Sequence, residues 1–356
     1  MKMRWMVALV VAVAPLISDA DDGDRSLDTL GTRVTASYIA PAMSEFKTAA
    51  VGMESALQRL CSENGTREQA EMAFEHLVKA WSGIEFLRFG PLVEANRFEN
   101  IYFWPDPRGV MTRQVQALLG NSEADIPNSQ ELATQSIALK GLPALEYVLY
   151  RDEGLLASES RSSDAPACVY SQAVAGHLVA LSTELAGQWS QGGEQAAAFA
   201  NPGQDNPLYR NSLEVAAEIT KALSTGLQFQ AEAKLASALG SDAENANIRK
   251  APFWRSGLTL VAIESAVRGM KAFYESAEFH FPESQWIDQN IRGEMQRAAA
   301  QLASLKSPAQ QLLSTDAGHR ELTLVVLQLR NAKSLVDQDM APALGVRIGF
   351  NALDGD

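Results

Sequence analysis

The sequence of 356 residues has few of the side chains on which common enzyme classes depend. It contains only two cysteines and four histidines, and the histidines lie in unrelated segments. The HExxH, GxSxG, paired CxxC and CxxCH patterns are absent, as is a glycine-rich phosphate loop. These absences exclude HExxH zinc proteases, serine hydrolases of the nucleophile-elbow type, c-type haem proteins and P-loop nucleotide enzymes.

Positive charge is also scarce. Thirty Lys and Arg residues face 43 Asp and Glu residues, which gives a formal net charge of −13. Nucleic acids and anionic lipid surfaces both require a basic protein surface. We therefore expect no nucleic-acid partner.

Long apolar runs are missing after the first twenty residues, so we expect no transmembrane segment in the mature chain. Residues 1–20 begin with Lys2 and Arg4, continue with an apolar run, and end with the small residues Ser18 and Ala20. That run is too short for a hydrocarbon layer of about 30 Å. The pattern predicts a cleavable secretory signal with cleavage after Ala20.

Export places the two cysteines, Cys61 and Cys168, in an oxidising compartment. Two thiols in such a chain most simply form one disulfide. Neither cysteine has a histidine or second cysteine nearby, which disfavours a role as ligand or nucleophile. The bridge would close a loop of roughly a hundred residues, which stabilises a fold by about 4–5 kcal/mol.

Helical periodicity dominates the chain, and alternating strand patterns are nearly absent. We predict an all-α protein built of two packed helical-bundle domains, with bundles of the up-and-down type. The segment Ser190–Tyr209 is rich in Gly, Asn, Gln and Pro and predicts a loop between them. The predicted domains are residues 21–195 and 205–356, and the main helices are expected at residues 66–91, 128–150, 166–189, 212–239, 256–274, 288–305 and 322–341.

Two of these helices carry a carboxylate on an apolar stripe. Glu85 and Arg88 fall on one stripe, and Glu146 lies within another. A bare carboxylate in a core costs several kcal/mol, so each needs a partner, a metal or a wet cavity. The stripe residues are Phe74, Leu77, Val78, Trp81 and Ile84 in the first helix, and Leu142, Leu145 and Leu149 in the second.

An aromatic stretch, FENIYFW at residues 98–104, is too apolar for a free loop. One interpretation makes it a lid or wall over Glu85 and Glu146, with Asp106 and Arg108 near its base. The other, which we favour, is an irregular segment packed between helices, with Asp106 capping the helix that follows.

Several stretches in order resemble the imelysin-like family. They are Trp81–Pro91, Asn100–Gly109, Gly141–Tyr150, Trp254–Gly257 and the ending LGVRIGFNALDGD. The resemblance implies an exported bacterial envelope protein, located in the periplasm, with two helical bundles. Members of this family are often iron-regulated; some are classed as metallopeptidases, and others accompany iron-uptake components.

The family signature GxHxxE implies a His and a Glu on one helix face, as a metal pair requires. In this chain Gly141 and Glu146 match, but Pro143 occupies the histidine position. Proline provides no ligand atom, and within the predicted helix it should cause a kink near Leu139. The expected ligand-binding residues are Glu85, Arg88, Trp104, Asp106, Gly141, Glu146, Arg255 and Glu264.

Two interpretations of the acidic pair remain open. Glu85 and Glu146 could hold iron or calcium through their oxygens, since hard cations take oxygen ligands. Alternatively, Glu85 and Arg88 neutralise each other.

We expect a non-catalytic binding or accessory protein linked to iron uptake, with other iron-uptake envelope proteins as partners. The alternatives are an imelysin-type metallopeptidase and an envelope scaffold. We also expect the C-terminal tail to dock against the bundle.

Overall fold

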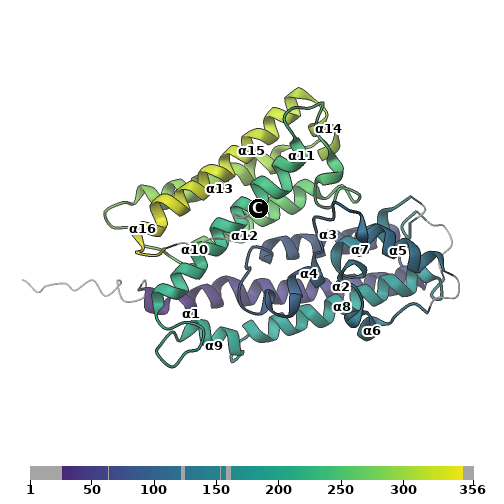
Figure 1. Cartoon of the computed structure of the whole chain (residues 1–356), viewed down its shortest axis with the longest axis horizontal. Coiled ribbons are helices and arrows are strands. Elements are labelled where there is room, and N and C mark those ends of the chain that lie inside the picture. The colour runs from purple at the N-terminus through teal and green to yellow at the C-terminus, as the bar shows by residue number, and fades with distance from the viewer. Residues whose placement is uncertain (1–25, 63, 122–124, 153, 158–161, 348–356) are drawn as a thin grey trace, which may run out of the picture.

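The structure is a computed structural model that describes residues 26–62, 64–121, 125–152, 154–157 and 162–347. Throughout these ranges all regular elements are helices and none is a strand, so the predicted all-α fold is confirmed (Figure 1). The predicted signal peptide and most of the predicted C-terminal docking segment lie outside the described residues. Among the described helices, none combines the length and apolarity needed to cross a membrane.

The helices form two packed groups, as predicted (Figure 1). The first comprises α1 (Leu30–Val34), α2 (Ala40–Cys61), α3 (Arg67–Ile84), α4 (Arg97–Ile101), α5 (Val110–Gly120), α6 (Ser129–Thr134), α7 (Gly141–Tyr150), α8 (Pro166–Trp189) and α9 (Glu194–Ala200). The second comprises α10 (Ser212–Gln228), α11 (Ser237–Leu239), α12 (Thr259–Ser276), α13 (Trp286–Ser304), α14 (Ala309–Leu313), α15 (Asp316–Leu335) and α16 (Ala341–Ala343).

Shorter elements connect and extend these helices. The π-helical segments are η2 (Thr35–Ile39), η6 (Phe229–Ala236) and η8 (Val336–Met340). The 3₁₀ turns are η1 (Leu27–Thr29), η3 (Gly90–Leu92), η4 (Glu94–Asn96), η5 (Ile137–Leu139) and η7 (Ile248–Lys250).

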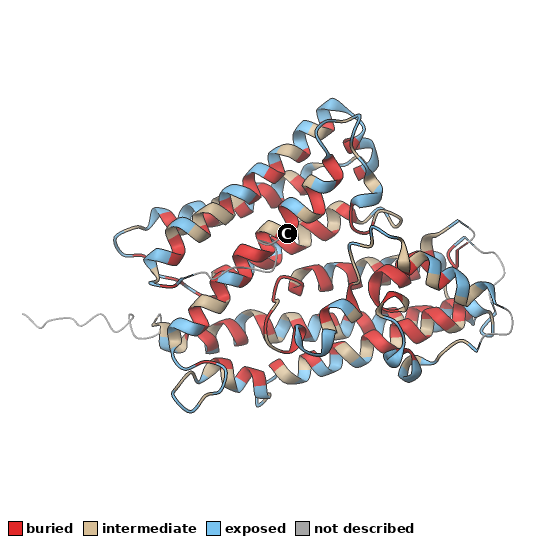
Figure 2. Ribbon diagram, in the orientation of Figure 1, coloured by how far each residue is buried: buried red, intermediate tan, exposed pale blue. Residues whose placement is uncertain are grey.

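Each group is built around facing apolar surfaces. In the first, α2 packs against α3 and α8; in the second, α13 packs against α12 and α15. The contact of α12 with α3 joins the two groups. Buried residues lie on the facing sides of these helices and exposed residues on the outer sides (Figure 2). Burial of these amphipathic faces is the main driving force for the fold.

The predicted disulfide is confirmed. Cys61, the last residue of α2, is bonded to Cys168 in the first turn of α8, with the two Cα atoms 5.9 Å apart. Both cysteines are buried. The bridge spans 107 residues of sequence and fixes the ends of two neighbouring helices.

The first helix of the predicted site ends earlier than expected. The sequence predicts a helix to about residue 91, but α3 ends at Ile84, and Glu85 is its C-terminal cap. The residues that follow, Phe86 and Leu87, are almost completely buried as well. Consecutive side chains of a helix point in different directions, so a helix with one buried face would not bury Glu85, Phe86 and Leu87 together. The chain turns after Ile84 instead. Arg88 therefore lies beyond the helix.

The prediction of one continuous helix over residues 128–150 is also wrong, because the chain there forms three separate elements, α6, η5 and α7. Gly141 begins α7 with φ +75°, and a Cβ there would lie 2.2 Å from the Ile101 carbonyl oxygen, so only glycine fits. Pro143 then stands in the first turn, where the missing N–H costs nothing. The kink predicted near Leu139 does not form; the carbonyl of Leu139 accepts a hydrogen bond of 2.9 Å from the Tyr170 hydroxyl.

The segment predicted as an interdomain loop contains α9, whose Phe199 is fully buried. The ring of Phe199 lies 5.6 Å from those of Phe89 and Trp189, so an aromatic cluster orders this connection. The prediction of an unstructured loop at residues 190–209 is therefore wrong in part, because the compositional bias towards Gly and Asn concealed one buried aromatic anchor.

Candidate functional site

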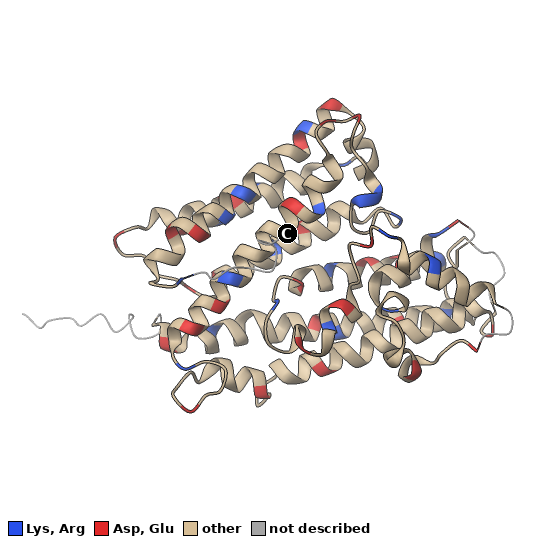
Figure 3. Ribbon diagram, viewed as in Figure 1, with Lys and Arg blue, Asp and Glu red and all other residues tan. Residues whose placement is uncertain are grey.

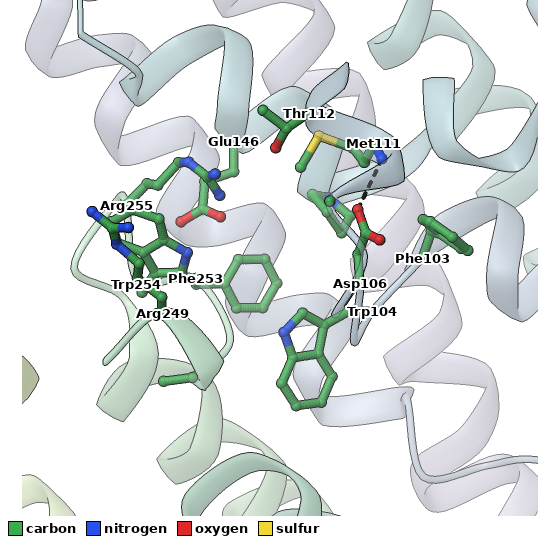
Figure 4. Close-up of a pocket in the computed structure, with 13 residues that line it drawn as sticks. Phe103, Trp104, Asp106, Met111, Thr112, Glu146, Arg249, Phe253, Trp254 and Arg255 are labelled. Carbon is green, nitrogen blue, oxygen red and sulfur yellow. Dashed lines mark hydrogen bonds between the residues drawn. The ribbon is translucent and has the colours of Figure 1, made fainter. Parts of the chain in front are cut away.

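A cavity of about 180 Å³ lies where the first helical group meets the segment that precedes α12 (Figure 4). The first group contributes residues from α5, α7 and the loop before α5, and the second contributes residues 249–255. The lining consists of Phe103, Trp104, Asp106, Gly109, Met111, Thr112, Pro143, Glu146, Arg249, Ala251, Phe253, Trp254 and Arg255.

Glu146 is the buried carboxylate of this cavity, with 3% of its surface exposed. Its Oε1 atom accepts two hydrogen bonds from Ser256, one from the backbone N–H at 2.9 Å and one from the hydroxyl at 2.8 Å. Burial raises the pKa of Glu146, while the Ser256 hydrogen bonds and the positive charge of Arg255 oppose that rise. Ser256 lies in the loop before α12 and not in the helix predicted over residues 256–274.

Asp106 faces the same cavity, but its oxygens already accept hydrogen bonds. Oδ1 accepts the backbone N–H of Val110 at 2.9 Å, and Oδ2 accepts that of Met111 at 2.8 Å (Figure 4). The predicted capping of the following helix is thus confirmed. The favoured interpretation of the aromatic stretch therefore agrees with the structure at this residue, although Phe103 and Trp104 also line the cavity.

Cationic and aromatic side chains form the opposite part of the lining. The guanidinium carbon of Arg255 lies 4.4 Å from the ring centre of Trp254 and 5.1 Å from that of Tyr147. Arg249 lies 5.8 Å from the Trp254 ring. Contacts of this kind hold a guanidinium in place without neutralising its charge. Sequence reasoning found Arg255 but missed Arg249, and it missed Ser256 as the partner of Glu146.

Glu85 and Arg88 belong to a separate buried cluster. Glu85 is fully buried, and its Oε1 atom accepts a hydrogen bond of 3.0 Å from Gln230 and forms an ion pair with the fully buried Lys234. The predicted pairing of Glu85 with Arg88 is not what the structure shows. The guanidinium carbon of Arg88 instead lies 4.0 Å from the ring centre of Phe98 and 4.2 Å from that of Phe229.

The ring of Tyr102 lies between the cavity and the Glu85 cluster. It stacks on Trp104 and Phe253, with ring centres 5.8 and 5.5 Å apart, and both of those residues line the cavity. On the cluster side, the Lys234 ammonium lies 5.4 Å from the same ring. The structure therefore brings Trp104, Asp106, Glu146 and Arg255 together but leaves Glu85 and Arg88 outside the lining.

The remaining predicted residues have other surroundings. Gly141 is part of the close contact that starts α7. Glu264 accepts a hydrogen bond of 2.8 Å from Arg268 on α12 and is not part of the cavity lining.

The donor set near Glu146 does not fit a metal ion. In the described part of the chain, no three His, Cys, Asp or Glu side chains come together in a group that could hold one. Glu146 Oε1 accepts a hydrogen bond from Ser256, and Asp106 Oδ1 accepts one from the backbone at the start of α5. Two arginines line the same cavity. Pro143 lines the cavity at the position of the signature histidine. Metal binding by Glu85 and Glu146 stays a prediction without a supporting ligand set.

The fold and site define a helical protein with a cavity between its two helical groups. The family model for imelysin (peptidase family M75) matches residues 35–336, and the chain belongs to this family. A search of curated proteins found no match.

Two solved structures share the fold. An imelysin-like protein from Psychrobacter arcticum 273-4 is 18% identical, with a TM-score of 0.74 over 91% of this chain and 98% of that chain. A protein named as an iron-regulated protein A precursor, from Parabacteroides distasonis ATCC 8503, is 13% identical, with a TM-score of 0.69 over 88% of this chain and 94% of that chain.

Proposed function

We propose that this imelysin-family protein is exported to the periplasm and acts there as a non-catalytic binding protein of iron uptake. Its ligand would occupy the cavity around Glu146, with Trp104, Asp106 and Arg255 as further contacts. The observation that carries the proposal is the buried Glu146 carboxylate, which faces an open cavity rather than a closed core (Figure 4).

The makeup of the cavity supports ligand binding. A buried carboxylate destabilises a fold unless it is compensated, so its presence beside an open volume is typical of a functional site. Aromatic walls with a few convergent polar groups are the usual composition of small-molecule sites. Both helical groups contribute residues, so a bound ligand would contact both of them.

The link to iron rests on the family and its relatives. The similar protein from Parabacteroides distasonis carries an iron-regulated name. One feature of this chain agrees with export to the periplasm, namely the predicted signal at residues 1–20.

The non-catalytic part of the proposal rests on the donor set. A metallopeptidase activates water on a metal held by about three protein ligands. Here Pro143 replaces the signature histidine, and Asp106 is engaged as a helix cap. We therefore expect no cleavage of a casein-derived peptide mixture by the purified chain, with or without added Zn²⁺. Cleavage that a chelator abolishes would establish the metallopeptidase alternative instead.

The iron-uptake role is tested by deleting the gene and following the uptake of radioactive iron by cells grown under iron limitation. We expect slower uptake in the deletion strain, restored by the full-length chain and not by a chain that lacks residues 1–20. Equal uptake with and without the gene would contradict the proposal.

A further inference from the structure

A second hollow of about 600 Å³ adjoins the Glu146 cavity. The two share Thr112, Arg249, Trp254 and Arg255, and the hollow extends along the end of α7 towards α14. Its lining is Thr112, Gln116, Tyr147, Tyr150, Arg151, Asp152, Arg249, Trp254, Arg255 and Gln310. We call it the arginine groove.

Three guanidinium groups form a row in this groove. Arg151 and Arg255 lie 5.7 and 5.1 Å from the ring centre of Tyr147, and Arg255 and Arg249 lie 4.4 and 5.8 Å from that of Trp254. Arg255 is the middle member of the row, because it shares the Tyr147 ring with Arg151 and the Trp254 ring with Arg249.

The row keeps most of its positive charge, because Arg255 is the one member whose charge acts on a described carboxylate of the site, that of Glu146 in the adjoining cavity, and it does so without a direct ion pair. Among the described residues, none of the three guanidiniums forms an ion pair or a side-chain hydrogen bond. Among the described residues that line the groove, Asp152 is the single acidic one, against three arginines. Elsewhere in the chain acidic and basic positions are interspersed, and the net charge is −13 (Figure 3). The groove is thus a local site of positive charge on an acidic protein.

From this arrangement we propose that the arginine groove binds a small polycarboxylate anion, either free or as its ferric complex. The proposal rests on the proposed function, because it names the chemical class of the ligand. Guanidiniums bind carboxylates through paired hydrogen bonds. A row of three suits separate carboxylates on one carbon skeleton better than a single compact phosphate, and the rings of Tyr147, Tyr150 and Trp254 offer apolar contact to that skeleton.

The experiment is calorimetric titration of the full mature chain with citrate and, separately, with ferric citrate and inorganic phosphate, all at low ionic strength. We expect citrate or its ferric complex to bind, and Arg255→Gln to weaken binding at least about tenfold, the usual effect of losing a charge-assisted contact. Added salt should weaken binding further. Whichever form of citrate binds more tightly identifies the ligand.

Arg210→Gln is the matched control, since Arg210 is exposed and precedes α10, near α1 at the opposite end of the molecule from α5 (Figure 1). Arg249→Gln, at an exposed position, provides a second groove variant. Melting temperatures verify that each variant folds. The proposal is overturned if neither form of citrate binds, if Arg255→Gln and Arg210→Gln bind equally, or if phosphate binds as tightly as citrate.

The groove and the proposed function can fail separately. Citrate binding in a chain whose deletion leaves iron uptake unchanged would contradict the iron-uptake role and leave the groove assignment in place. Slower uptake in the deletion strain without citrate binding would contradict the groove assignment alone.

Discussion

Lys234 and Glu85 form an ion pair in which neither side chain has any exposed surface, and this pair links η6 of the second helical group to the end of α3 in the first. Gln230, one turn earlier in η6, donates to the same carboxylate oxygen at 3.0 Å. Two groups that cost free energy to bury therefore depend on each other for compensation. The pair makes the contact between the helical groups specific as well as apolar.

Removing the cation should destabilise the fold strongly. We expect Lys234→Met to lower the free energy of unfolding by about 3–5 kcal/mol, because it leaves a buried carboxylate without a counter-ion. The double variant Glu85→Leu with Lys234→Met should recover most of this loss. Urea unfolding at pH 7 measures both.

Lys333→Met is the matched control, because Lys333 pairs with Asp337 at a partly exposed position on α15 and should contribute less than about 1 kcal/mol. If Lys234→Met were no more destabilising than Lys333→Met, the buried pair would not be a stability element.

Acid should destabilise the protein through His177. This histidine is 6% exposed, and burial, aided by the charge of Lys140, lowers its pKa to about 4 from 6.5. The unfolded state then binds more protons between these values, so stability is full above pH 6.5 and falls as the pH drops towards 4. The loss at pH 4 is about 3 kcal/mol by linkage.

Replacing the imidazole should remove this dependence. We expect the free energy of unfolding of His177→Leu to change less between pH 6.5 and pH 4 than that of the wild type. His280→Gln provides the control, since His280 is exposed. An unchanged slope in His177→Leu would show that other groups govern acid unfolding.

The pKa shift of Glu146 changes the pH dependence of stability in the opposite direction to that of His177. Its pKa is raised by burial, so between its ordinary value and its raised value the folded state holds the proton that the unfolded state has released. Stability consequently falls as the pH rises through this window. Glu146→Gln should remove the cost and stabilise the fold at pH 7, but not at pH 4. A loss of stability at pH 7 would mean that the ionised carboxylate is fully compensated.

Restoring the family signature should create a metal site. Pro143 and Glu146 both line the cavity from α7, three residues apart, which is the spacing of a His/Glu pair on one helix face. We expect Pro143→His to bind Zn²⁺ at least about tenfold more tightly than Pro143→Ala, as a histidine adds a nitrogen ligand. Titration calorimetry compares the two, and equal affinities would show that the cavity cannot accommodate the ion.

The sequence revealed local features well, because they depend on neighbouring residues. The predicted helix starts at residues 66 and 128 agree with the starts of α3 and α6, each of which begins with a capping box, at Thr66 and at Asn128. The disulfide followed from the presence of only two cysteines in an exported chain. Burial of Glu85 and Glu146 followed from their places on apolar stripes.

Partners from distant segments were not predictable in the same way. The choice of Lys234 over Arg88 for Glu85, and of Ser256 for Glu146, depends on how the two helical groups pack. The sequence does indicate that Lys234 is buried, since it falls on the apolar stripe of Leu223, Leu227 and Ala231. A lysine at such a position needs a buried acidic partner. The early end of α3 could not be predicted, because the helical spacing of apolar residues continues past Ile84 in the sequence.

The cavity around Glu146 is tested most directly by iron uptake in the deletion strain that carries Glu146→Gln or Glu264→Gln. Both changes remove one carboxylate charge, but Glu264 pairs with Arg268 outside the cavity lining. We predict uptake near the level of the deletion strain for Glu146→Gln and near the wild-type level for Glu264→Gln, at equal protein abundance. Equal uptake by the two variants would contradict a functional role for the cavity.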